Sequence, residues 1–170
     1  YLDHQIGLLM QALKERDLYD QTTIIITSPH GESLGENEYY FDHHNLSEVV
    51  LRVPLLIKPD KQTIYPKGAT INGIFDSIDL FPTLIEAFGL PSLNSLSGKS
   101  RWKQIYTGNE IPPHDSIAVD YNQAAITLVR EPFLYFKIIK EGFFHPESCW
   151  KTHIKKGKAL YHFNDSIQYT

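Results

Sequence analysis

The chain has 170 residues, of which 42% are hydrophobic, and a formal net charge of -4 at pH 7. A chain of this length and hydrophobic content can bury a real core, which excludes a wholly disordered protein. Acidic and basic residues are mixed along it, so no basic stripe is available to bind a nucleic-acid backbone. The single cysteine, Cys149, excludes an internal disulfide and a zinc site made of several thiolates. No apolar run approaches the roughly 20 residues that span a bilayer.

The chain opens directly on a helical pattern. Leu2, Ile6, Leu9 and Leu13 recur at helical spacing and predict an amphipathic helix of about four turns. No initiating methionine and no charged-then-apolar leader precedes them. We therefore expect a piece of a longer protein whose leader or membrane anchor lies upstream, so that the parent protein would be exported or membrane-anchored; the compartment stays undecided.

Two strands and a second helix follow. Residues 23–27 are β-branched and continuously apolar, which suits a strand covered on both faces, and residues 28–45 then read as a polar loop. A second strand is predicted near residues 53–57. Asp79 is a candidate N-cap for an amphipathic helix that stops at Gly89.

The character of the sequence changes after this helix. Residues 91–115 are polar and rich in turn formers, which predicts a long connection rather than another strand and helix. Beyond it, successive aromatic and β-branched runs predict strands at residues 116–120, 124–130, 133–140 and 159–163. Strands that follow one another indicate an antiparallel sheet appended to an α/β unit. We predict an α/β portion over residues 1–110 and a small antiparallel β subdomain over residues 111–170.

The segment "SPHGESLGE" lies where a strand ends in a polar loop, and open α/β sheets place ligands at such ends. His30 offers an imidazole, Gly31 and Gly35 allow close backbone approach, and Glu32 and Glu36 offer carboxylates that could bind a metal or orient a ligand. The alternative for His30 is a hydrogen-bonded structural histidine.

A second polar cluster, "FDHHN", contains Asp42, His43 and His44. Its spacing fits a loop that folds back to the same crevice. Either histidine could act as a general acid near neutral pH or donate to an anionic oxygen. The alternative is a pair of surface histidines.

Arg52 and a group of lysines near the C-terminus have structural explanations. Arg52 lies in an apolar stretch, and a guanidinium there needs a carboxylate or carbonyl partner. The lysines near the C-terminus fit a solvated hairpin loop better than a site for an anionic substrate; they are Lys151, Lys155, Lys156 and Lys158.

Several segments, in this order, resemble one family. They are "YLDHQIGLLMQALKERDLYDQT", "IIITSPHGESLGE", "FDHHNLSEVVLRVPLLIKP", and "DSIDLFPTLIEAFGLP" with "SGKS", followed by "REPFLYFKII" and "KALYHFNDS". Together they resemble the C-terminal part of the sulfatase family in the alkaline phosphatase superfamily. The resemblance implies part of an alkaline-phosphatase-like α/β sandwich, with a mixed sheet flanked by helices and a small C-terminal antiparallel sheet.

The resemblance also implies an activity and a cofactor. The family hydrolyses sulfate esters, or related phosphate and phosphonate esters, at a divalent metal, with calcium expected first and manganese or zinc as alternatives. Its nucleophile is a formylglycine made in a CxPSR-like segment, and an early acidic pair supplies two metal ligands. Neither segment occurs in this sequence. We therefore expect the chain by itself to hydrolyse no sulfate ester and to bind no calcium.

Two site residues carry over from the family, and one position departs from it. His30 falls on the second member of the family's Asp-His or Asp-Asn metal pair, and His43 falls where a histidine or lysine contacts the sulfate or the leaving-group oxygen. Pro29 falls on the aspartate of the pair. Proline has no side-chain ligand atom, whereas calcium and magnesium depend on carboxylate oxygens.

These features leave three functions open. The first is a sulfatase acting on a sulfated small molecule or glycan. The second is a phosphoethanolamine or phosphoglycerol transferase, or a phosphonate or phosphate ester hydrolase, of the same superfamily. The third is a degenerate non-catalytic member. A chain without its upstream strands would also leave a sheet edge exposed, which predicts a homodimer through that edge.

Overall fold

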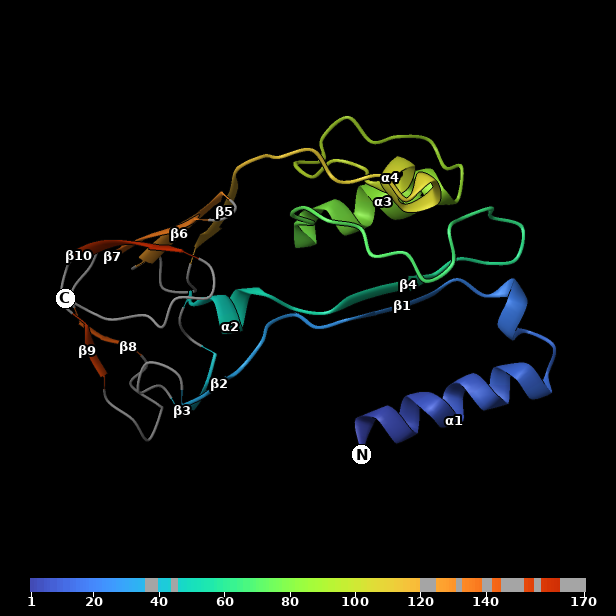
Figure 1. Cartoon of the computed structure of the whole chain (residues 1–170), viewed down its shortest axis with the longest axis horizontal. Coiled ribbons are helices and arrows are strands. Elements are labelled where there is room, and N and C mark those ends of the chain that lie inside the picture. Colours follow the sequence, from blue (N-terminus) through green and yellow to red (C-terminus); the bar gives the residue numbers. More distant parts are fainter. Residues whose placement is uncertain are drawn as a thin grey trace. The chain divides into compact units, whose positions relative to one another are not determined.

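The computed structural model describes residues 1–35, 40–43, 46–119, 125–130, 133–138, 142–144, 152–154 and 157–162. The chain divides into two compact units (Figure 1). The first unit comprises Tyr1–Thr27, Pro54–Asn72 and Ser77–Ile111, and the second comprises Ser28–Val53, Gly73–Asp76 and Pro112–Thr170. The predicted division of the sequence after residue 110 stays a prediction.

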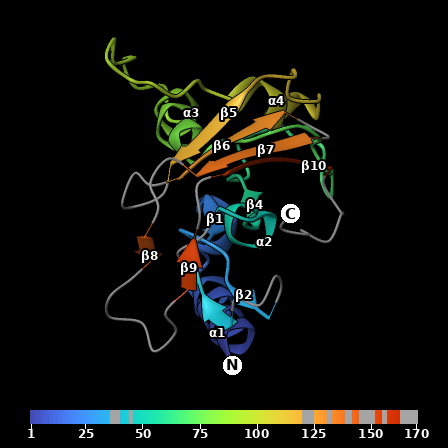
Figure 2. The ribbon, with the colours of Figure 1, turned by 90° about the vertical axis from the view of Figure 1, so that its left-hand side faces the viewer.

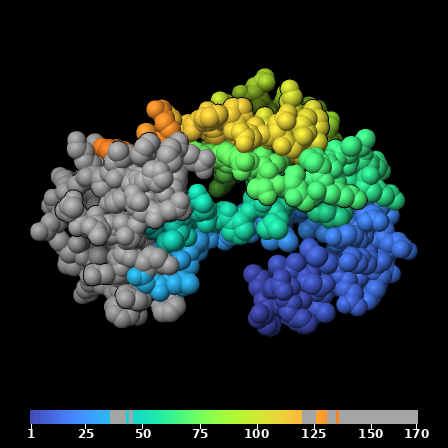
Figure 3. Space-filling view, viewed as in Figure 1, coloured from blue at the N-terminus to red at the C-terminus, as the bar shows by residue number. Residues whose placement is uncertain are grey.

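The first unit begins with the predicted amphipathic helix. Helix α1 covers Leu2–Glu15, and a short 3-10 helix, η1, covers Tyr19–Gln21. No residue of α1 is buried, and Leu2 and Leu9 are 71% and 59% exposed. Figure 3 shows the N-terminal segment that contains α1, in the darkest blue, at the surface. The helical period was therefore predicted correctly, but the apolar face is not covered by the described residues.

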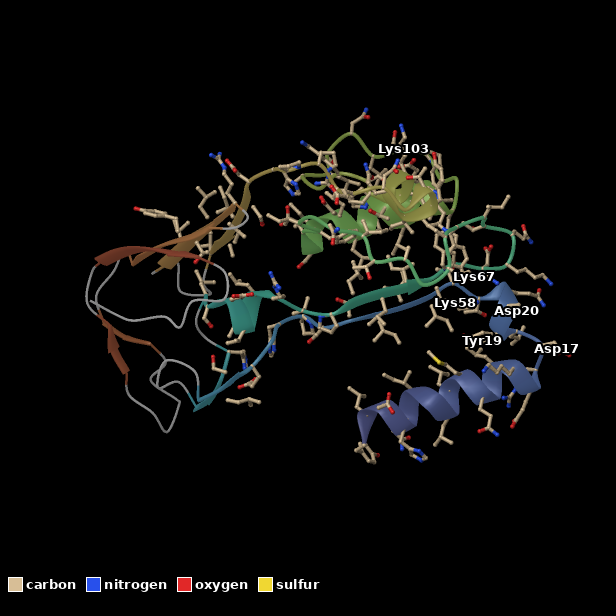
Figure 4. All side chains as sticks on the ribbon, in the orientation of Figure 1. Asp17, Tyr19, Asp20, Lys58, Lys67 and Lys103 are labelled. Atoms are coloured by element: carbon tan, nitrogen blue, oxygen red, sulfur yellow. The ribbon has the colours of Figure 1, made fainter. Side chains whose placement is uncertain are left out.

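Strands β1 (Ile24–Thr27) and β4 (Leu55–Lys58) form an antiparallel pair with Ile24 opposite Lys58. The isoleucines of β1 are half-buried rather than covered on both faces as expected. The Lys58 amine reaches from β4 to the carbonyl oxygens of Tyr19 and Thr22, at 2.6 and 2.9 Å (Figure 4). It also lies 4.5 Å from the centroid of the Tyr19 ring. Lys58 therefore ties the strand pair to η1.

The second predicted helix is α3, Leu80–Ala87, preceded by the 3-10 helix η3, Ser77–Asp79. It ends as predicted at Gly89, which has a φ of +61°. The Gly89 N–H donates to the Glu86 carbonyl, and the Leu90 N–H donates to the Ile85 carbonyl at 2.9 Å. This pair of bonds is a Schellman motif, which requires the left-handed residue that glycine supplies.

The polar connection after α3 contains a helix that sequence analysis missed, α4, Trp102–Thr107. Asp79 stands at the N-cap position of α3 but makes no capping bond with its side chain, contrary to the prediction. Its carboxylate instead accepts from Arg101 Nε at 2.6 Å and from the Lys99 N–H at 2.7 Å. Both side chains of the Asp79–Arg101 pair are buried, so an ion pair across 22 residues holds the connection against α3.

The described residues of the second unit form a short helix, α2 (Glu48–Leu51), and three antiparallel sheets. Figure 2 shows the largest, in the order β10, β7, β6, β5. All four strands start and end within two residues of the predicted ones, and they cover Ser116–Val119 (β5), Ala125–Arg130 (β6), Phe133–Ile138 (β7) and Gly157–His162 (β10). The two smaller pairs are Ser33–Leu34 (β2) with Tyr40–Asp42 (β3), and Gly142–Phe144 (β8) with Thr152–Ile154 (β9).

The predicted combination of an α/β portion with an antiparallel sheet is present. The buried apolar side chains among the described residues are Leu46, Val50, Pro59, Ile85 and Ile111. No described helix is long and apolar enough to cross a bilayer.

Candidate functional site

The loop that follows β1 is anchored on α2 through Gly31. The Gly31 N–H donates to the carbonyl oxygen of Val50 at 2.7 Å. A Cβ atom at Gly31 would lie only 1.9 Å from the carbonyl oxygen of Val49. The backbone therefore approaches α2 more closely than any other residue would allow, and this contact fixes the start of the loop.

The hairpin formed by β2 and β3 brings Glu32 next to His43. Ser33 pairs with Asp42 across this ladder, so the residue before Ser33 and the residue after Asp42 are neighbours. His43 Nδ1 lies 3.2 Å from Glu32 Oε2. Each of the two side chains is 39% exposed. The described parts of this loop, residues 28–35 and 40–43, thus lie side by side, as its spacing predicts.

The ring of His30 stacks on that of His43, with centroids 3.9 Å apart and an angle of 14° between the ring planes. His30 Nδ1 lies 2.8 Å from the carbonyl oxygen of Gly31, and the Ser28 hydroxyl donates to the His30 carbonyl at 2.6 Å. Carbonyl and carboxylate oxygens only accept hydrogen bonds, so Nδ1 of each histidine carries the hydrogen. In the neutral form, each ring then presents its lone pair at Nε2.

Three potential ligands of a metal meet in this loop. One ligand atom from each of His30, Glu32 and His43 lies within 4.8 Å of the others. This donor set does not fit calcium, which takes 6–8 oxygen ligands. It contains one carboxylate and two imidazoles, and Pro29 adds no donor. These residues therefore support no catalytic step through calcium, and the predicted metal role of His30 stays a prediction.

The other residues singled out in the sequence fall into two groups. Arg52 has the carboxylate partner that was predicted, because its Nε lies 3.2 Å from Glu48 Oε1, although its side chain is 60% exposed. Glu36, His44, Cys149, Lys151, Lys155 and Lys156 lie outside the described residues.

Sequence analysis missed a second polar cluster, which lies at the start of β5. His114 Nε2 lies 3.0 Å from Asp76 Oδ2, and the Ser116 hydroxyl donates to the other oxygen of the same carboxylate. His114 Nδ1 faces the carbonyl oxygen of Pro112 at 3.2 Å. Asp76 lies 38 residues before His114, so no pattern of neighbouring residues in the sequence predicts this cluster.

The comparisons with known proteins agree on one family. The family model described as Sulfatase matches residues 1–90, which is more than half of the chain. The multifunctional alkaline phosphatase superfamily protein PehA of Trinickia caryophylli is 35% identical over 104 residues, covering 58% of this chain and 19% of that protein. Arylsulfatase K of Gallus gallus is 30% identical over 98 residues, covering 58% of this chain and 18% of that protein. The matched part is about a fifth of the length of these relatives.

Solved structures show the same fold. BT4656, solved with its substrate D-glucosamine-2-N,6-O-disulfate, matches with a TM-score of 0.72 and 21% identity over 94% of this chain and 31% of that one. The phosphonate monoester hydrolase of Silicibacter pomeroyi matches with a TM-score of 0.70 and 21% identity over 95% of this chain and 32% of that one. The predicted alkaline-phosphatase-like α/β fold is confirmed by these likenesses. The chain belongs to the sulfatase family of the alkaline phosphatase superfamily.

Proposed function

We propose that this chain is the C-terminal part of a metal-dependent hydrolase that cleaves sulfate esters. Membership of the sulfatase family supports the reaction class. The observation that carries the proposal is the placement of His43, which Glu32 holds at 3.2 Å and against which His30 stacks. When Nδ1 of a histidine donates to a carboxylate, Nε2 is the ring atom that can exchange a proton with a substrate.

His43 would act on the leaving group. When a nucleophile attacks the sulfur atom, the bond between sulfur and the ester oxygen breaks, and protonated His43 donates its Nε2 proton to that oxygen as the alcohol leaves. The CxPSR-like segment and the early acidic pair are absent from the 170 residues. The nucleophile and most metal ligands would then come from another part of the full-length protein, and the chain alone would be inactive.

The substrate class that we favour is a sulfated sugar or another small sulfate ester. BT4656, which has the same fold, was solved with a sulfated glucosamine as its substrate. The alcohol of such an ester is a poor leaving group, so its departure needs a proton donor.

The experiment that tests this role compares two substrates in the full-length protein. Replacing His43 by alanine should lower kcat/KM for a sugar sulfate by about 10²–10⁴-fold, the usual contribution of a general acid. The loss should be much smaller for 4-nitrophenyl sulfate, because nitrophenolate leaves without a proton. His4→Ala, an exposed histidine of α1, is the matched control and should change neither rate. Equal losses on both substrates would contradict the assignment of His43.

Hydrolysis of phosphonate or phosphate esters is the second candidate. PehA and the phosphonate monoester hydrolase of Silicibacter pomeroyi both resemble this chain. Measuring kcat/KM of the full-length protein for a sulfate monoester and for a phosphonate monoester with the same leaving group separates the two candidates. A preference for the phosphonate would replace the first proposal by the second.

We also propose a homodimer through the edge of the β1–β4 pair. Neither strand has another ladder partner among the described residues, and Leu56 on β4 is 57% exposed. Unpaired backbone groups on an apolar strand favour pairing with a second chain. Light scattering of the purified chain should give the mass of a dimer, and a monomeric mass at high concentration would reject this proposal.

A further inference from the structure

We propose that the side of α4 that faces solvent binds a sulfated glycan chain through Trp102, Lys103 and Tyr106, with Lys99 at one end. We call these four residues the α4 surface. The choice of a sulfated sugar rests on the proposed function, and the inference adds to it a place that holds a further sugar of a longer chain. None of the four residues takes part in the chemistry proposed for His43.

The inner side of α4 is fixed within the first unit. Arg101, at the N-cap position, is buried against Asp79 at 2.6 Å and donates its backbone N–H to the Thr83 hydroxyl at 2.9 Å. At the other end, Gly108 has a φ of +73°, and a Cβ atom there would lie 2.7 Å from Pro66 Cγ. The rotation of α4 about its own axis is therefore set by contacts at both ends.

This orientation leaves two aromatic rings and a lysine together on the outside of the helix. Lys103 and Tyr106 are three residues apart, and Trp102 and Tyr106 are four apart, so the three occupy neighbouring positions on the helix surface. Figure 3 shows the segment that contains α4, in yellow, at the surface, and in the view of Figure 4 Lys103 extends away from the β1–β4 pair. Lys99 is also exposed, and its backbone N–H is held by Asp79 at 2.7 Å.

The two rings of this surface meet edge to face. The ring centroids of Trp102 and Tyr106 lie 6.2 Å apart, with an angle of 61° between the ring planes. Such a contact uses one face of one ring only, and Tyr106 remains 40% exposed. The pair is thus held in one arrangement before a ligand arrives, which lowers the entropy lost on binding.

The charge of this segment is opposite to that of the chain as a whole. Residues 87–109 contain Lys99, Arg101 and Lys103 but no aspartate or glutamate, whereas the net charge of the chain is -4. Asp79 compensates the charge of Arg101. Lys99 and Lys103 form no ion pair with any residue that the structure describes. Their ammonium groups therefore favour an anionic ligand, whose oxygens accept charge-assisted hydrogen bonds.

The combination of rings and lysines narrows the class of ligand. A pyranose sugar presents a face of C–H bonds, which packs on the electron-rich face of an aromatic ring. A sulfate group on the same sugar points outward from its rim and can reach a lysine beside the ring. Aromatic rings with basic neighbours also bind single-stranded nucleic acid, so DNA is the comparison that the test has to include.

The test is a titration of the purified chain with a heparin hexasaccharide, followed by the fluorescence of Trp102. Trp150→Phe removes the second tryptophan of the sequence, so the signal comes from the α4 surface. We expect saturable binding that weakens as salt is added, because salt screens exposed charges. A hyaluronan hexasaccharide, which carries carboxylates but no sulfate, and a single-stranded DNA of equal charge should each bind at least about tenfold more weakly.

Variants of the α4 surface locate the binding. Lys99→Ala with Lys103→Ala should weaken heparin binding about 5–30-fold at low salt. Tyr106→Ala should weaken it about 2–10-fold, whereas Tyr106→Phe, which keeps the ring, should retain the affinity. Lys14→Ala with Lys61→Ala removes the same charge from exposed positions elsewhere in the first unit and should leave the affinity unchanged. Far-UV circular dichroism checks that each variant is folded.

Several results would overturn the inference. These are heparin binding that the α4 variants do not weaken, equal weakening by the Lys14 and Lys61 control, and binding of hyaluronan or DNA as tight as that of heparin. The proposed function fails on different evidence, because it depends on the leaving-group comparison in the full-length protein. Heparin binding through the α4 surface in a protein without sulfatase activity would uphold this inference alone, and hydrolysis without such binding would uphold only the proposed function.

A full-length protein that hydrolyses sulfated glycans gives a second readout. A surface that holds one part of a polymer raises the local concentration of its other parts. Lys99→Ala with Lys103→Ala should therefore raise KM for a sulfated polysaccharide and leave kcat unchanged, with neither constant altered for 4-nitrophenyl sulfate. A loss of kcat on both substrates would contradict a role in holding the chain.

Discussion

The buried ion pair between Asp79 and Arg101 should be the strongest single electrostatic contribution to the first unit. Arg101 Nε lies 2.6 Å from Asp79 Oδ2, and only 9% and 3% of the arginine and aspartate side chains are exposed. Replacing Arg101 by methionine keeps much of the side-chain volume and removes the charge. The Asp79 carboxylate is then left buried without a cation. Removing one partner of a buried ion pair costs more free energy of unfolding than replacing both partners by apolar residues.

The expected loss of unfolding free energy depends on which hydrogen bonds Asp79 keeps after the substitution. Removing one partner of a buried pair costs about 3–5 kcal/mol. The Lys99 N–H still donates to Asp79 at 2.7 Å, so we expect a loss near the lower end, about 3 kcal/mol. Arg52 supplies a matched control, because its ion pair with Glu48 spans one helical turn and its side chain is 60% exposed. Arg52→Met should lower the free energy of unfolding by no more than about 0.5 kcal/mol.

Urea denaturation of the chain measures both effects. Trp102, next to Arg101 on α4, reports the transition by fluorescence, and far-UV circular dichroism gives an independent reading. With a slope of about 1–3 kcal/mol per molar urea, a loss of about 3 kcal/mol moves the midpoint by about 1–3 M. The reasoning is refuted if Arg101→Met is no more destabilising than Arg52→Met. A double variant with Asp79→Asn should be less destabilised than the sum of the two single variants, because the two residues interact.

Three further predictions concern the loop and the sheet of the second unit. Gly31→Ala should push the loop away from the Val49 carbonyl oxygen and lower the free energy of unfolding by about 1–3 kcal/mol; an unchanged urea titration would contradict the close contact. The hydrogen bond from Arg130 holds the pKa of the Asp115 carboxyl below its usual 3.8. The ionised pair therefore stabilises the sheet above that pH, and this contribution to the unfolding free energy is lost as the pH falls through the lowered pKa. The difference in unfolding free energy between the wild type and Asp115→Asn, measured against pH, should therefore vanish in acid, and a constant difference would contradict the assignment. Pro29→Asp adds a carboxylate beside the site and should raise calcium affinity of the full-length protein about tenfold in calorimetry, whereas unchanged affinity would show that Pro29 is not the limiting defect.

Local patterns predicted the regular elements well. The helical spacing from Leu2 to Leu13 gave the bounds of α1 to within two residues, and Gly89 marks the end of α3 as predicted. These features depend on neighbours along the chain, such as side-chain period and the left-handed conformation of one glycine. The missed helix α4 has only six residues, too few for an apolar period to stand out.

The candidate site could be predicted only in part. The sequence pointed to His30 and His43, and Glu32 was recognised as a possible carboxylate, but no pattern showed that Glu32 and His43 would be hydrogen-bonded. That contact depends on the register of β2 with β3, which is set by pairing across the hairpin. The role of Asp79 was misjudged for a similar reason, because its partner Arg101 lies 22 residues away.

The sequence by itself determined the helices α1 and α3, most strands and the family, because the side-chain period, the turn residues and the order of the family-like segments can be read along the chain. Tertiary structure alone decided that the two imidazoles stack and that the Glu32 carboxylate lies beside His43. The physical reason is that hydrogen bonds and metal ligands act over a few ångströms in space. Only the anchored loop at Gly31 and the β2–β3 pairing bring these side chains within that range.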